Sequence, residues 1–209
     1  MATKHDGNQL LKWTAWSINA LWLSALLLTT GPAFARTDLT AAAANTTDRA
    51  KDGIDDISIQ RELNVFKKVA ILLVDALASA QKLHRNATVV DASFDGSPPS
   101  PVFRVKSFSG AWVWEDVIDA SSGKPVGAAI PTAVKDLDER DRRILASLTF
   151  VKQDVLDAVR VAERNITGKA ISAGLVEEKS KLNFIVVVVS GNDLKQVFLE
   201  PPVRRPSKR

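Results

Sequence analysis

The feature that most constrains the fold of this 209-residue chain is an internal repeat with an offset of 81 residues. A helix-like segment followed by three strand-like segments occurs once before residue 128 and again after residue 148. The offset aligns Ala92 with Ala173, Phe103 with Phe184, Val105 with Val186, and Ser109-Gly110 with Ser190-Gly191. A repeat indicates the architecture before any single residue does, so we expect two units of the same kind.

The hydrophobic pattern predicts the elements of each unit. In the first unit, residues 58–128, it predicts a long helix over residues 59–84, then strands at 88–94, 102–108 and 111–119. In the second unit, residues 148–201, we expect a helix that is capped by Thr149 and ends at Gly168. Strands are then predicted at 169–176, 182–190 and 193–200. Residues 129–147 are predicted to be a linker with a helical part.

Two short turns, Ser109-Gly110 and Ser190-Gly191, imply antiparallel strand pairing. The predicted fold class is therefore α+β, with two α-β-β-β units, each an antiparallel sheet packed against a helix. The run from Ile185 to Val189 is apolar on both faces of its strand. Such a strand is either covered on both sides or placed at a contact between the two units. The sequence leaves open whether the units share one sheet.

The N-terminal region predicts export from the cell. Residues 1–35 have the layout of a secretory signal peptide: Lys4 and Lys12, an apolar run from Ala15 to Leu28, and a small-residue motif that ends at Ala35. We expect cleavage after Ala35 and a periplasmic or secreted protein, with an uncleaved membrane anchor as the alternative. Residues 36–57 are predicted to be a flexible lead-in, and residues 202–209 a basic disordered tail.

Composition narrows the classes of function. The formal net charge is only +4, so charge alone does not indicate nucleic-acid binding, and we expect no nucleic-acid partner. The chain contains no cysteine, which excludes disulfides, cysteine catalysis and cysteine-ligated metals. After signal cleavage no remaining segment is long and apolar enough to span a membrane. The oligomeric state does not follow from the sequence.

Trp112 and Trp114 are the strongest candidates for a binding site. Alternation along the predicted strand 111–119 puts them on one face together with Asp116, and Val113 and Val117 on the opposite face, which we expect to be the core. Two interpretations have equal weight: a recognition surface, since Trp is favoured at binding hot spots, or packing within the protein. Arg104, on the preceding strand, completes the candidate binding set.

The other polar candidates have simpler explanations. His84 is predicted to lie at a helix end, where the helix dipole favours it, and it has no second histidine or cysteine nearby. The carboxylates of the first unit allow acid–base chemistry or calcium binding, but turn and cap roles explain them better. This set comprises Asp91, Asp95, Glu115, Asp116 and Asp119. We therefore expect no catalytic residues, no cofactor and no metal.

At these residues the chain resembles a bacterial PepSY domain. The resemblance rests on Asp91 to Gly96, on Pro101 to Lys106, and on Trp114-Glu115 followed by Val117 to Gly123, which ends in the hydrophobic-Asp-Ala-x-x-Gly pattern. The second unit is similar through Gly168 to Ala173 and Phe184 to Val187. Its ending, Leu199 to Pro202, departs from that pattern, so it resembles a degraded copy.

The resemblance implies an exported, non-enzymatic module. The family occurs in bacterial envelope proteins and in the propeptides of thermolysin-like proteases, where an inhibitory role is proposed. It therefore implies a binding or regulatory protein that contacts an envelope protease or another periplasmic protein or peptide. A peptide that adds to a free strand edge is one way to make that contact. The alternative is a sensor of a small ligand or a metal ion, and an enzyme is the least supported class.

Overall fold

The computed structural model describes residues 58–151, 153–178 and 181–201. These residues form an α+β structure built on one antiparallel sheet of seven strands. The predicted signal peptide, lead-in and basic tail, at residues 1–35, 36–57 and 202–209, lie outside the described residues. Along the chain, a helical stretch at residues 58–66 comes first. It is followed by α2 (Leu73–Gln81), β1 (Thr88–Asp95), β2 (Val102–Ser109), β3 (Trp112–Asp119), β4 (Ile130–Ala133), the 3-10 helix η2 (Val134–Asp136), α3 (Glu139–Leu148), α4 (Val155–Asn165), β5 (Lys169–Glu178), β6 (Lys181–Ser190) and β7 (Asp193–Leu199).

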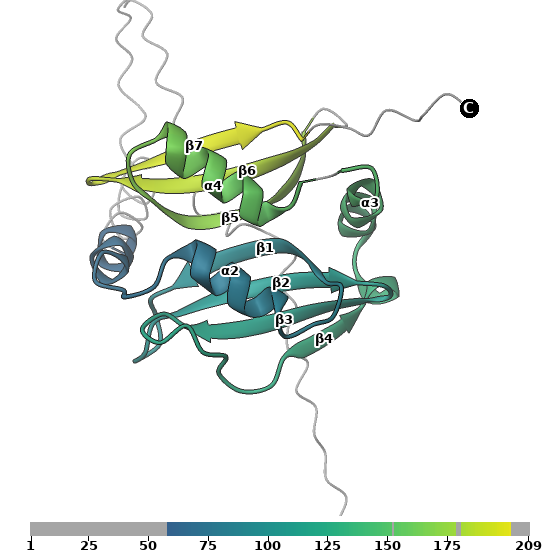
Figure 1. Cartoon of the computed structure of the whole chain (residues 1–209), viewed down its shortest axis with the longest axis horizontal. Helices are drawn as coiled ribbons and strands as arrows, with labels where there is room; N and C mark the ends of the chain where they lie inside the picture. The colour runs from purple at the N-terminus through teal and green to yellow at the C-terminus, as the bar shows by residue number, and fades with distance from the viewer. Residues whose placement is uncertain (1–57, 152, 179–180, 202–209) are drawn as a thin grey trace, which may run out of the picture.

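The seven strands answer the question that the sequence left open, because both halves of the repeat share one sheet. The strand order is β4-β3-β2-β1-β5-β6-β7, and β1 pairs with β5 at the junction (Figure 1). Ala92 lies directly opposite Ala173 there, flanked by the pairs Asp91–Gly174 and Ser93–Ser172. Ala92 and Ala173, which the 81-residue offset aligns, thus meet at the junction. The α+β class and the antiparallel pairing are confirmed, and the strands of both halves belong to a single sheet.

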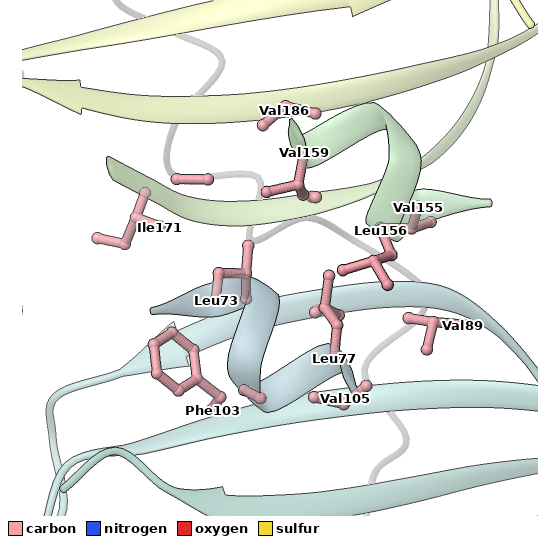
Figure 2. Packing of buried hydrophobic residues seen from close by; sticks show 14 of the residues in the cluster. Leu73, Leu77, Val89, Phe103, Val105, Val155, Leu156, Val159, Ile171 and Val186 are labelled. Atoms are coloured by element: carbon pink, nitrogen blue, oxygen red, sulfur yellow. The ribbon is translucent and has the colours of Figure 1, made fainter. Parts of the chain in front are cut away.

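Helices α2 and α4 cover the same face of the sheet (Figure 1). Between this pair and the strands lies the main core, where Leu73 and Leu77 of α2 and Val159 of α4 are fully buried. Figure 2 shows Leu73 and Leu77 above Phe103 and Val105 of β2, and Val159 beside Val186 of β6. Strand β6 lies inside the sheet, and its run Ile185–Val189 is buried throughout, as its two-sided apolar pattern predicted.

The prediction of one long helix over residues 59–84 is wrong, because the helix is interrupted between residues 66 and 73. Phe66 and Leu73 are seven residues apart, which is about two helical turns. The apolar periodicity therefore continues across the interruption, and the sequence pattern does not reveal it. Helix α2 has its own start, where the Asp75 carboxylate accepts a hydrogen bond from the Leu72 backbone N–H at 3.0 Å. The Ile71 N–H instead donates to the carbonyl of Ala120, which ties the break to the end of β3.

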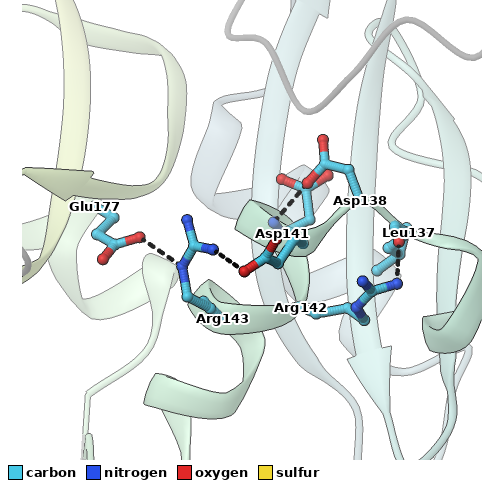
Figure 3. A network of polar contacts seen from close by, with 7 residues as sticks. Leu137, Asp138, Asp141, Arg142, Arg143 and Glu177 are labelled. Carbon is cyan, nitrogen blue, oxygen red and sulfur yellow. Dashed lines mark hydrogen bonds and ion pairs between the residues drawn. The ribbon is translucent and has the colours of Figure 1, made fainter.

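The region between the units is more structured than predicted. Strand β4 was not predicted, because four residues that include a proline give too short a pattern. Helix α3 begins after Asp138, whose side chain accepts from the Asp141 N–H at 2.8 Å, and Arg143 links it to Glu177 of β5 at 3.6 Å (Figure 3). Thr149 does not cap the second long helix: it ends α3, and Asp154 caps α4.

Candidate functional site

Strand β3 brings three of the four predicted binding residues together. Trp112, Trp114 and Asp116 alternate along β3 and share the face that α2 covers, together with the buried Ile118. This corrects the expected orientation, since the main core lies on the tryptophan side rather than on the side of Val113 and Val117. Both faces are partly apolar, so alternation alone did not identify the covered one.

Arg104 does not join this group. In the β2–β3 register Arg104 lies opposite Val117, so its side chain is on the sheet face away from α2. There its guanidinium contacts the carboxylates of Asp95, at 3.0 Å, and Glu115, at 3.5 Å. The hairpin turn at Gly110 fixes this register, so counting back from the turn would have separated Arg104 from the tryptophans.

His84 is the residue that sequence reasoning missed. Helix α2 ends at Gln81, and the His84 Nε2 atom lies 2.9 Å and 3.1 Å from the two carboxylate oxygens of Asp116. The His84 ring also stacks on Trp114, with centroids 4.6 Å apart and planes 14° from parallel. The interpretation of His84 as a helix-dipole residue therefore omitted its real partners. They are about 30 positions away in the sequence, and no local pattern indicates them.

Burial is the largest influence on the pKa of the Asp116 carboxyl. The Asp116 side chain is 3% exposed and that of His84 is 14% exposed. Burial raises the pKa of Asp116, while the hydrogen bond from His84 and its charge lower it in part. The His84 ring, which is hydrogen-bonded to the buried Asp116 carboxylate, stacks on Trp114. This contact restricts the Trp114 side chain, so Trp114 is a rigid support.

Trp112 extends from this support toward solvent. Its side chain is 45% exposed, and its ring centroid lies 6.3 Å from that of Trp114, with the planes tilted by 38°. Strand β4 continues the surface, because Pro131 lies opposite Trp114 in the strand register. We call Trp112, Trp114 and Pro131 the Trp112 surface. An exposed aromatic ring next to a fixed one is suited to binding an apolar or extended segment.

Ser107 lies beside this group but does not complete a catalytic arrangement. It pairs with Trp114 in the β2–β3 register and is fully buried. Its hydroxyl has no hydrogen-bond partner among the described residues, so it is not hydrogen-bonded to His84 or Asp116. A nucleophile that a histidine activates needs such a contact. Ser107 is therefore not placed as a nucleophile that His84 activates.

The remaining carboxylates of the first half are dispersed. Asp119 accepts hydrogen bonds from Ser121 and Ser122 in the turn after β3, and these bonds lower its pKa. Asp95 and Glu115 are held by Arg104 on the face opposite Asp116. Across the described ranges, no group of three or more His, Cys, Asp or Glu side chains is placed to hold a metal ion.

Asp91 lies on the face away from α2, in a cross-strand row with Lys106 and Glu115. Burial raises its pKa to about 6, against the lowering effect of the Lys106 charge and with a smaller raising effect of Glu115. Between about pH 4 and pH 6 the folded protein therefore holds a proton that the unfolded chain has released. The contribution of Asp91 to the free energy of unfolding therefore falls as the pH rises from about 4 to about 6.

Replacing Asp91 by asparagine is expected to stabilise the protein at neutral pH. The amide keeps the shape of the side chain but removes the cost of placing a charge at this partly buried position, a gain of about 1–3 kcal/mol at pH 7 that disappears near pH 4. Urea unfolding of Asp91→Asn and wild type at the two pH values measures it. A variant that is less stable at pH 7 would show that attraction to Lys106 outweighs the cost of burial.

Comparison with known proteins adds little to these findings. No family model matches the chain, and no curated protein matches it. A crystal structure of a candidate lipoprotein from Clostridium difficile 630 is similar with 14% identity over 66% of this chain and 93% of that one, at a TM-score of 0.37. This level of similarity does not establish a shared fold. None of the helices that the structure describes is long and apolar enough to cross a membrane.

Proposed function

We propose that this chain is an exported, non-enzymatic binding or regulatory module, similar to PepSY domains, that contacts an envelope protease or another periplasmic protein or peptide. The observation that carries the proposal is the exposed Trp112 side chain beside Trp114, which His84 and Asp116 hold in place. Export rests on the signal-like residues 1–35 alone.

The geometry of the Trp112 surface suits protein recognition for a physical reason. A tryptophan that is transferred from water into an interface removes a large apolar area and retains an N–H donor. Because Trp114 is already fixed by stacking and by the pair beneath it, binding orders few additional side chains, so less entropy is lost. Pro131 on the adjacent edge strand β4 adds a rigid apolar neighbour.

The strand arrangement supports the interpretation as two PepSY-like units. Helix α2 precedes the antiparallel strands β1 to β3, and helix α4 precedes β5 to β7 in the same order. The residues that the 81-residue offset equates, Ala92 and Ala173, lie opposite each other where the two sets of strands join. An approximate two-fold relation between two copies of one unit accounts for that placement.

Truncation of Trp112 is expected to remove most of the binding. Peptides selected by phage display against the wild-type protein should bind Trp112→Ala about 30-fold more weakly, the usual cost of losing a hot-spot tryptophan. Isothermal titration calorimetry measures this. Phe150→Ala is the matched control, because Phe150 is a large aromatic residue that is 63% exposed and lies outside the Trp112 surface.

Experiments on the wild-type protein and Trp112→Ala also distinguish this proposal from the alternative, a sensor of a small ligand or a metal ion. Titration with divalent cations and small envelope ligands, followed by tryptophan fluorescence, should leave the emission unchanged if the surface recognises proteins. A saturable response to a small ligand, together with selected peptides that bind Trp112→Ala and wild type equally, would overturn the proposal in favour of the sensor.

A further inference from the structure

The two edges of the sheet differ in how they are protected. Strand β4 forms one edge with only four residues, including Pro131, which has no backbone N–H to offer a neighbour. Strand β7 forms the other edge with seven residues and no proline, and no described residue pairs with its outer side. A long unprotected edge of this kind is a template for another strand.

The β6–β7 hairpin determines which backbone groups of β7 face outward. Its turn has two residues, begins with Gly191 at a φ of +65°, and places Ser190 opposite Asp193. The pair that flanks a two-residue turn exchanges backbone hydrogen bonds, and the pattern then alternates along a ladder without bulges. The outward N–H and C=O groups therefore belong to Leu194, Gln196 and Phe198.

The side chains of these three residues share one face of β7, opposite the face of Val197, which pairs with the buried Val186. Phe198 is 52% exposed, which is a large apolar surface to leave in water at a strand edge. Leu194 is partly buried against the core. The edge therefore combines free backbone groups with apolar side chains at matching positions.

We propose that β7 pairs with β7 of a second copy of this chain, antiparallel and with the two-fold axis at Gln196. This register sets Gln196 opposite its own copy and Leu194 opposite Phe198 on both sides of the axis. All three pairs then use outward backbone groups, the largest number that any symmetric register of this strand allows. Each Leu194–Phe198 pair also buries apolar surface across the joint. The two copies of Lys195 are not directly opposite each other.

The resulting dimer has a single continuous sheet with its α2 and α4 helices on one face. The Trp112 surface lies next to β4, at the edge opposite β7, so both copies of it stay accessible in the dimer (Figure 1). This inference is independent of the proposed function, because it uses different strands. If both hold, the dimer presents two binding surfaces and gains affinity for any partner that has two matching segments.

Sedimentation velocity of the purified protein, expressed from the whole chain, tests the dimer over a concentration series. Gln196→Pro removes an N–H that faces outward and leaves the bonds to β6 in place, whereas Gln196→Ala keeps that N–H and is the matched control. We expect Gln196→Ala to dimerise as wild type does, and Gln196→Pro to raise the dimer Kd at least ~10-fold. Phe198→Asp serves the same purpose should Gln196→Pro not fold.

A cross-linking experiment tests the register itself. The chain has no cysteine, so a single thiol introduced by Gln196→Cys should link two copies through a short bismaleimide, and Ser121→Cys, beyond the other half of the sheet, should not. A wild-type protein that stays monomeric at every concentration would overturn the proposal. A dimer that is equally strong in folded Gln196→Pro and Gln196→Ala, or that cross-links at residue 121 instead, would also overturn it.

Discussion

Replacing Gly168 by alanine is expected to lower the free energy of unfolding by about 3 kcal/mol or more. Gly168 lies between α4 and β5 with a φ of +158°, a conformation that residues with a side chain rarely adopt. A Cβ atom there would collide with the backbone carbonyl oxygen of Val189 and would lie 2.8 Å from Val188 Cγ1. Neither the backbone of β6 nor a fully buried valine can move aside at low cost.

Thermal unfolding measures this loss, which corresponds to a fall in Tm of about 6 to 12 °C for a chain of this length. Gly127→Ala is the matched control, since Gly127 also has a positive φ, +74°, but a Cβ atom added there would meet no atom of a non-neighbouring residue within 4 Å. Backbone strain alone should cost that variant about 1 kcal/mol. Equal losses for both variants would show that the close approach to β6 is not the cause.

Replacing His84 by alanine is expected to destabilise the protein by about 2–4 kcal/mol at pH 7. The variant loses the stack on Trp114 and leaves the Asp116 carboxylate buried without its hydrogen-bond donor. Burial already raises the pKa of Asp116, and removal of His84 takes away the influences that lower it. The folded variant therefore binds a proton more readily than its unfolded chain, so the loss is smaller at about pH 4 than at pH 7.

A double-mutant cycle isolates the contribution of the pair. Asp116→Ala removes the buried charge, so adding it to His84→Ala should restore part of the stability lost at pH 7. Urea unfolding of the four proteins at both pH values gives the coupling energy. Additive losses with no dependence on pH would show that the stack on Trp114, rather than the hydrogen bond to Asp116, is the main contribution of His84.

The sequence predicted the strands more accurately than the helices. All six predicted strands occur, with ends within two residues of those expected, because apolar alternation and the two Ser-Gly turns act over short distances. The break after Phe66 escaped prediction, since the helical period continues across it. Strand β4 escaped because its formation depends on Trp112 to Glu115 being available as a neighbour, not on its own four residues.

The sequence likewise predicted some features of the candidate site and missed others. Alternation along β3 was enough to predict that Trp112, Trp114 and Asp116 share a face, and the structure confirms it. The sequence did not indicate that Arg104 belongs to the other face in the register, or that His84 reaches Asp116. It gave His84 a helix-end role because the dipole of its own helix is the only partner that local reasoning provides.

Sequence alone therefore determined the α+β class and the identity of six of the seven strands, because these depend on residues within one element or one turn. Only the tertiary structure decided that Ala92 and Ala173 meet in one shared sheet, that α2 covers the tryptophan face of β3, and that β7 is left as an edge. Each of these outcomes depends on which apolar surfaces bury each other, and such choices are made between segments that are far apart in the chain.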